Sequence, residues 1–269
     1  MKTPKTIMER ILLPASLAAF FVACVACTVK EDRNPCPCNL TVSFLDPETN
    51  GPVELLGWDS EMVFRERVHI ENNRSEWRKS VRKGIFTLSV YNGSADSSIQ
   101  TGHEIRIPLK CQADSLYAYY KRIDATGDFA HAEVLLRKQF ATVFLDFQKS
   151  EDVLRACRFL VEGNTCGFDI LDHSPIVGPF SFEPIPVIGE TVVTFRIPRQ
   201  ADDSLAIIIQ SEDAPSARYS IGEDIRRAGY NWKAEELQDI YLSIDLVRGL
   251  VDLQVANWED GTEFPLVEK

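Results

Sequence analysis

The sequence predicts an all-β protein made of two β-sandwich domains in tandem after a lipoprotein signal peptide. Three observations support this: an apolar N-terminal run that ends in cysteines, short alternating stretches throughout the rest of the chain, and two pairs of similar motifs in the same order. Alternation with a period of two is typical of half-buried strands, and many short strands separated by turns favour sandwiches. The 269 residues, 45% of them hydrophobic, suffice for one or two cores.

The N-terminus has the pattern of a secretory signal peptide. Three basic side chains, Lys2, Lys5 and Arg10, precede an apolar run over residues 11–23. This run is shorter than the ~20 apolar residues that a membrane-spanning helix needs, and Pro14 weakens it as a long helix. We therefore expect a signal peptide rather than an uncleaved anchor.

Two cysteines follow small residues near the end of this run, at Ala23-Cys24 and Ala26-Cys27. A cysteine in this position resembles the lipobox of bacterial lipoproteins, in which the thiol is alkylated with diacylglycerol before cleavage. We favour Cys27 as the lipidated residue, with Cys24 as the alternative, because a charged group at residues 30–32 follows Cys27 closely. That group resembles the acidic signal that sends lipoproteins of Bacteroides-type bacteria to the exterior of the outer membrane. Lipid chains would then hold the protein on the membrane.

The remaining cysteines are candidates for disulfides, because an exported protein reaches an oxidising compartment. Their pairing stays open: a local Cys36–Cys38 pair, a bond from one of these to Cys111, and Cys157 with Cys166 are all compatible with the sequence. An odd number remains, so at least one thiol is unpaired or pairs between chains. The tight Cys-Pro-Cys and the scattered histidines do not match a zinc site, and we expect neither a metal nor a cofactor.

Two pairs of similar motifs indicate an internal duplication. Residues 105–120 and 195–210 both contain Arg-Ile-Pro, a polar turn, Asp-Ser-Leu and an apolar strand. Upstream, TVSFLD from Thr41 matches TVFLDF from Thr142. Because the order is the same in both copies, we expect two related domains of typical size.

The duplication sets the expected domain boundaries. Helical patterns are few and short, at residues 150–155 and 233–238, so both copies are expected to consist mainly of strands. We expect a lipoprotein signal peptide, an N-terminal tether, an N-terminal β-sandwich and a C-terminal β-sandwich, at residues 1–26, 27–38, 39–132 and 133–269 respectively.

Both ends of the mature chain carry recognisable segments. CTVKEDRNPCPCNL is followed by alternating strands, and residues 230–261 contain Tyr-x-Trp, a short linker, Asp-Ile, an acidic residue and a strand that ends in Trp-Glu-Asp. In this order the segments resemble those of the FimB-type fimbrial anchor lipoproteins, within the fimbrillin group of the Bacteroidales. The positions that match the closing segment are Tyr230, Trp232, Leu237, Asp239, Ile240, Asp245 and Trp258.

The resemblance implies two transthyretin-like β-sandwich domains and a lipid anchor in the outer membrane, with the protein facing the cell exterior. It also implies a place at the base of a fimbria, where the protein attaches the filament and helps limit its length. The implied contact with a stalk or other fimbrial subunit is β-strand complementation, in which main-chain hydrogen bonds supply the affinity. Because Lys269 follows Trp258 closely, we expect a recipient or lateral role rather than donation of a long C-terminal strand.

Some residues allow both a functional and a structural interpretation. Ser115 and Ser204 lie in Asp-Ser-Leu segments that resemble O-glycosylation sites of Bacteroides-type bacteria, although Asp and Ser also suit turns that enter strands. The tryptophans could be contact anchors, but packing inside or at the edge of a sandwich is the simpler explanation. They are Trp58, Trp77, Trp232 and Trp258.

Composition and motifs limit the function further. The net charge of −11 argues against nucleic acid as a partner and against direct adhesion to anionic lipid. The sequence contains no Gly-x-Ser-x-Gly, phosphate loop, His-Glu-x-x-His or Rossmann motif, so we expect no catalytic residue and no enzymatic activity. The alternative function is that of a surface glycan-binding lipoprotein of a nutrient-uptake system, which would display Trp58 or Trp77 on one face.

Overall fold

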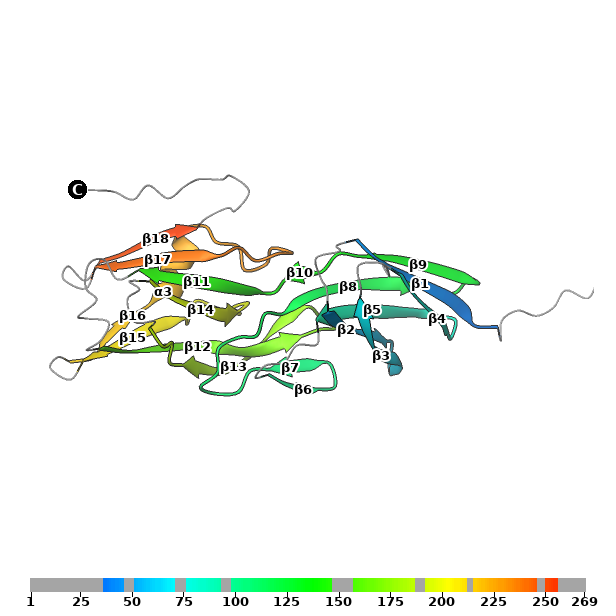
Figure 1. Cartoon of the computed structure of the whole chain (residues 1–269), viewed down its shortest axis with the longest axis horizontal. Coiled ribbons are helices and arrows are strands. Elements are labelled where there is room, and N and C mark those ends of the chain that lie inside the picture. The colour runs from blue at the N-terminus through cyan, green and yellow to red at the C-terminus, as the bar shows by residue number, and fades with distance from the viewer. Residues whose placement is uncertain are drawn as a thin grey trace, which may run out of the picture. The chain divides into compact units, whose positions relative to one another are not determined.

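Two β-sandwiches form the described part of the chain in the computed structural model (Figure 1), and the prediction of an all-β sandwich fold is confirmed. Both sandwiches belong to one compact unit, Cys38–Lys269. The expectations for the signal peptide, Cys24, Cys27 and Trp258 lie outside the described residues. The structure describes residues 36–45, 51–70, 76–92, 98–146, 157–186, 192–211, 215–245 and 250–255.

The first sandwich packs a three-stranded sheet against a five-stranded sheet. The smaller sheet has the order β4-β1-β9, with strands at Glu76–Val81, Cys38–Phe44 and Phe129–Val134. The larger sheet has the order β10-β8-β5-β2-β3, with strands at Arg137–Lys138, Tyr117–Asp124, Ile85–Asn92, Gly51–Trp58 and Met62–Ile70.

The second sandwich has a four-stranded sheet of order β14-β11-β17-β18 and a larger sheet of order β16-β15-β12-β7-β6, in which β13 also pairs with β12. The strands of the four-stranded sheet are β14 (Val192–Pro198), β11 (Phe140–Asp146), β17 (Ile240–Asp245) and β18 (Leu250–Val255). Those of the larger sheet are β16 (Ala217–Tyr219), β15 (Ala206–Ser211), β12 (Cys157–Asp169), β13 (Ser174–Phe182), β7 (Glu104–Arg106) and β6 (Ile99–Thr101).

Alternation of side chains explains why these segments form two-layered sandwiches. In β1, Cys38, Leu40, Val42 and Phe44 are buried and the residues between them are not. Successive side chains of a strand point to opposite faces, so β1 presents one apolar face to the first core. A second core forms in the same way around β11, whose Val143 and Leu145 are fully buried.

The two sandwiches repeat one strand order. β1 pairs antiparallel with β4 and parallel with β9, just as β11 pairs antiparallel with β14 and parallel with β17. Thr41 and Thr142, which begin one pair of similar motifs, therefore occupy equivalent strands. The other motif pair does not, because Arg106 lies in β7 and Arg196 lies in β14. This second match was an incorrect alignment of the duplication.

One hairpin departs from a sequential division of the chain. Strands β6 and β7 lie between β5 and β8 in sequence, yet β7 hydrogen-bonds to β12 in the second sandwich. Residues 99–106 of the segment expected for the first sandwich thus complete a sheet of the second (Figure 1). The short helix α3, Ile221–Arg227, was not foreseen, whereas residues 233–238 form turns and bends instead of the helix expected there.

Candidate functional site

The hairpin of β6 and β7 forms the centre of a junction between the two sandwiches. Strand β12 is long, and β15 pairs with its first half at Cys157–Glu162, while β7 pairs with Gly167–Asp169. Gly167 is required here, because a Cβ atom at this position would lie 2.3 Å from the carbonyl oxygen of Ile105. The hairpin therefore extends the sheet of the second sandwich with main-chain hydrogen bonds.

The chain that follows β7 crosses the second sandwich before it returns to β8. The Ile107 N–H donates to the Cys166 carbonyl (2.7 Å), and the Ala113 N–H donates to the Arg196 carbonyl (3.2 Å). The side chains of Ile107 and Ala113 are buried in the second core. This crossing segment contacts both sheets, since Cys166 belongs to β12 and Arg196 belongs to β14.

The turn between β12 and β13 packs on the outer face of the five-stranded sheet. Phe168 and Ile170 form an apolar cluster with Leu56, Tyr91 and Ala118, which point away from the first core. The Ser89 hydroxyl donates to the Ile170 carbonyl at 2.6 Å and is buried. The two sandwiches are thus joined by apolar packing as well as by backbone pairing.

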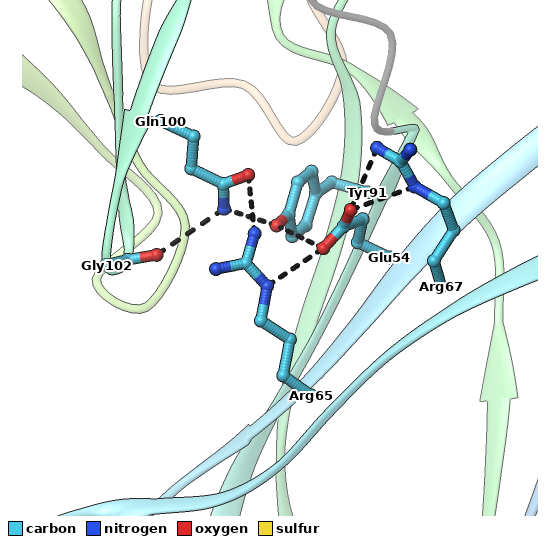
Figure 2. A network of polar contacts seen from close by, with 6 residues as sticks. All are labelled: Glu54, Arg65, Arg67, Tyr91, Gln100 and Gly102. Carbon is cyan, nitrogen blue, oxygen red and sulfur yellow. Dashed lines mark hydrogen bonds and ion pairs between the residues drawn. The ribbon is translucent and has the colours of Figure 1, made fainter.

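A polar network closes one side of this junction (Figure 2). The Glu54 carboxylate, 9% exposed, accepts hydrogen bonds from Arg65 Nε at 2.9 Å and Arg67 Nε at 3.0 Å. Arg65 Nη2 also donates to Gln100 Oε1 at 2.8 Å, and Gln100 Nε2 donates to the Tyr91 hydroxyl. Because Gln100 lies on β6, the network links the first sandwich to the hairpin that completes the second.

Two histidines lie at the same junction. His103 Nδ1 is 2.9 Å from Asp169 Oδ2, and its ring meets Trp58 edge-on with centroids 5.7 Å apart. The His173 ring stacks on Tyr120 at 5.0 Å. Burial, followed by the charge of Arg199, lowers the pKa of His173 to about 4, so this ring is neutral at pH 7.

The segment similar to the fimbrial closing signature packs beside the junction. Arg199, 5% exposed, donates to Gln139 Oε1 at 2.7 Å and to the Trp232 carbonyl. Tyr230 is buried against Trp232 with ring centroids 4.5 Å apart. The Leu237 N–H donates to the Lys138 carbonyl at 3.0 Å. Tyr230, Trp232 and Leu237, which match the closing segment, thus lie in a segment that is held against Lys138 and Gln139. Their role here is structural.

Asp239 and Ile240 continue this packing. Asp239 pairs with Lys138 and accepts a hydrogen bond from the Thr142 N–H at 3.0 Å, and Ile240 is fully buried as the first residue of β17. A cavity of about 50 Å³ lies nearby, lined by Gln100, Asp114, Gln139, Phe140 and Phe168 among others. Its size suits a few water molecules rather than a sugar ring.

No family model and no curated protein matches the chain. Solved structures do match: a candidate polysaccharide-binding protein from Bacteroides thetaiotaomicron has a TM-score of 0.63 at 12% identity, covering 82% of this chain and 99% of that chain. A candidate adhesin from Bacteroides ovatus has a TM-score of 0.58 at 12% identity, covering 83% and 94%. The fimbrial anchor protein Mfa2 from Porphyromonas gingivalis has a TM-score of 0.55 at 13% identity, covering 83% and 98%.

The chain has the fold of fimbrial and adhesin-type proteins. These neighbours are not enzymes. Among the described residues, no three His, Cys, Asp or Glu side chains gather closely enough to hold a metal ion. No described helix is both long and apolar enough to cross a membrane.

The cysteines expected to form disulfides are free thiols in the structure. Cys36 is exposed, Cys38 and Cys166 are buried, and Cys111 and Cys157 are partly buried against the second core. Burial raises the pKa of the Cys38 thiol. Apart from the exposed Cys36, these cysteines are buried or partly buried.

The two candidate glycosylation sites differ in exposure. Ser204 is exposed in the turn before β15, where its N–H donates to Asp202 Oδ1 at 2.9 Å. Ser115 is half-buried beside the junction, and its carbonyl accepts a hydrogen bond from Asn92 Nδ2 at 2.7 Å. Only the Ser204 side chain therefore lies where an enzyme could reach it readily.

The described tryptophans pack against other side chains. Trp77 is 9% exposed, packs on Phe64 and donates its indole N–H to Glu66 at 3.1 Å. Trp58 and Trp232 are half-buried. Sequence reasoning missed the Glu54 network altogether, because its members are separated in the sequence and converge only when β2, β3, β5 and β6 come together.

Proposed function

We propose that this protein is a lipid-anchored fimbrial subunit of the outer membrane, which attaches the filament base to the cell and helps limit filament length. The observation that supports this proposal best is the fold match to a fimbrial anchor protein, which covers 83% of this chain and 98% of that protein. Cys27, with Cys24 as the alternative, is the proposed lipidation site, and the protein faces the cell exterior. β-Strand complementation with a stalk or other fimbrial subunit is the proposed mode of contact.

The junction supports this function on physical grounds. A subunit that ties a filament to a membrane must transmit force along its own length. Here the hairpin β6–β7 and the turn after β12 interlock the two sandwiches, so their separation requires main-chain hydrogen bonds and an apolar cluster to break together. A flexible linker alone would give no such resistance.

Replacement of the proposed lipidated cysteine tests the anchor. Cys27→Ser should move the protein from the outer-membrane fraction to the soluble fraction and release filaments into the medium, whereas Cys24→Ser should leave both unchanged. Mass spectrometry of the N-terminal peptide should find an acyl group on Cys27. The proposal fails if deletion of the protein leaves filament attachment and filament length as they were.

Exposure favours Ser204 over Ser115 as an O-glycosylated residue in this function. Ser204→Ala should remove any glycan mass from the purified native protein, and Ser115→Ala should not. A native protein whose intact mass equals the mass of its lipidated polypeptide would rule out glycosylation of both.

A glycan-binding surface lipoprotein remains the second candidate function, because one structural neighbour is described as a candidate polysaccharide-binding protein. The buried ring of Trp77 and the half-buried ring of Trp58 provide no open aromatic platform. A glycan array decides the matter: saturable binding that Trp58→Ala abolishes would favour this candidate over the fimbrial one.

A further inference from the structure

Strand β9 lies at an open edge of the first sandwich, whereas its equivalent in the second sandwich is covered. β9 pairs in parallel with β1, as β17 pairs in parallel with β11. The outer side of β17 carries β18, which runs antiparallel to it from Ile240↔Val255 to Asp245↔Leu250. Among the described residues, no strand occupies the outer side of β9. Within the described ranges, the repeat therefore leaves one strand position of the first sandwich unfilled.

The main-chain groups on this edge point outward in a regular row. The Asn39 N–H donates to the Asp128 carbonyl at 2.8 Å, and the Leu45 N–H donates to the Val134 carbonyl at 2.9 Å. Alternate residues of a strand direct their N–H and C=O groups to opposite sides. Since Asp128 and Val134 face β1, the groups of Phe129, His131 and Glu133 face away from it.

Edge strands are usually protected by charges, proline, bulges or very short length. β9 has no proline, no shift in its register with β1 and only one carboxylate, Glu133. β3 carries Arg65, Glu66 and Arg67, and β6 and β16 have only three residues each. β9 has six residues in regular register, with alanines and a valine toward the core and with His131 and Glu133 as its basic and acidic residues. Its first residue, Phe129, is 80% exposed.

A polar atom beneath this edge is unsatisfied. The Tyr119 hydroxyl on β8 is buried and has no hydrogen-bond partner within the described part of the chain. Tyr119 packs against the first core, and its strand β8 contacts β9. Burial, followed by the charge of Glu133 on β9, raises the pKa of Tyr119. Buried polar groups normally have partners, and a strand added beside β9 would bring further main-chain groups to this part of the sandwich.

We infer that the outer edge of β9 accepts an extended strand of another fimbrial subunit, which runs antiparallel to β9 as β18 runs antiparallel to β17. The inference rests on the proposed function and specifies where strand complementation takes place. The incoming strand pairs with the outward groups of Phe129, His131 and Glu133 and covers the Phe129 ring. Its alternate side chains continue the apolar face of Ala130, Ala132 and Val134 and set the register.

Proline substitutions on the two edges of the same sheet test this. His131→Pro and Glu133→Pro each remove one outward N–H and leave the main-chain bonds to β1 intact, which edge strands tolerate. His131→Pro also removes the hydrogen bond between His131 Nε2 and Ser43 Oγ of β1, so Glu133→Pro is the cleaner variant. Arg78→Pro is the matched control on β4, the opposite edge of the same sheet. Arg78 lies opposite Thr41, whose main-chain groups face β9 and not β4. The Arg78 N–H therefore also points outward, and proline removes it without breaking a bond to β1. Full-length variants would be used to capture filaments sheared from the producing cells, after thermal unfolding has confirmed that each is folded.

The β9 variants should capture about tenfold less filament than wild type or more, and Arg78→Pro should capture the wild-type amount. A photoreactive residue at Phe129 should crosslink to a different subunit, and the same residue at Arg78 should not. Equal capture by all variants, or a crosslink to the same chain or to a second copy of it, would overturn the inference. If wild-type protein captures no filament, the proposed function itself fails, which is a distinct outcome.

Discussion

At the residue scale, Glu54 shows how the junction tolerates a buried carboxylate. Its oxygens accept hydrogen bonds from Arg65 and Arg67, so the charge is compensated on both sides. The guanidinium groups remain partly exposed, at 35% and 61% for the whole side chains, and solvent therefore weakens each pair. The network contributes geometry as well as energy, since Arg65 also positions Gln100 of β6.

Glu54→Gln should lower the free energy of unfolding by about 1–3 kcal/mol, because it leaves two arginines without their carboxylate. Chemical denaturation measures this. Glu236→Gln is the control, since Glu236 forms an exposed ion pair with Arg137, and its cost should stay within about 0.5 kcal/mol. Equal effects of the two substitutions would show that burial of Glu54 is not important for stability.

His173 should make stability dependent on pH. Its pKa is about 4 in the folded state and 6.5 as the ordinary value, so the unfolded chain binds the proton more readily. The contribution is therefore fully present above pH 6.5 and is lost as the pH falls toward 4, by about 1–3 kcal/mol in total after allowance for partial exposure.

His173→Asn tests this contribution, because asparagine tolerates the positive φ of 54° at this position. The difference in unfolding free energy between pH 7 and pH 4.5 should shrink in the variant. His69→Gln, at an exposed site, should keep the wild-type difference. An unchanged difference in His173→Asn would contradict the assignment.

At the element scale, β12 is shared between two partners along one of its sides. β15 covers its first half and the hairpin covers its last residues, so one strand spans the sandwich and the junction. The close approach of β7 depends on the absence of a side chain at Gly167. The hairpin and β12 therefore constrain each other's sequence although they are far apart in the chain.

Gly167→Ala should destabilise the protein by about 1–3 kcal/mol and increase proteolysis within residues 99–113, because the added methyl group displaces β7. Thermal unfolding and limited proteolysis give the two measurements. Gly127→Ala is the matched control, since the nearest atom to its new Cβ, the Phe129 carbonyl oxygen, is 3.7 Å away. Resistance of the 99–113 segment in Gly167→Ala would show that β7 has room to shift.

At the scale of the whole molecule, the interlocked junction predicts that the two sandwiches unfold together. Loss of either sandwich would expose the apolar cluster around Phe168 and Ile170 and would detach the hairpin. Calorimetry should therefore show a single transition, with equal calorimetric and van't Hoff enthalpies. Two separate transitions would show that the sandwiches are independent.

The sequence alone predicted the all-β class and the sandwich architecture, because alternating burial is a local property of strands with one buried face, such as β1. Thr41 and Thr142 were matched correctly for the same reason, since β1 and β11 occupy equivalent central positions. The motif match of residues 105–120 with 195–210 failed, because similar turns and strand starts recur wherever chains enter sheets. Here the two segments are in contact rather than equivalent.

Tertiary structure alone decided which sandwich receives the hairpin, which charges meet at Glu54 and which sheet edge stays open. Each of these depends on pairing between strands that are distant in sequence, and a strand's own residues specify its faces but not its neighbours. Local pattern therefore determined what kind of layers this chain builds. The packing of whole sheets determined how those layers are joined and where another strand can be added.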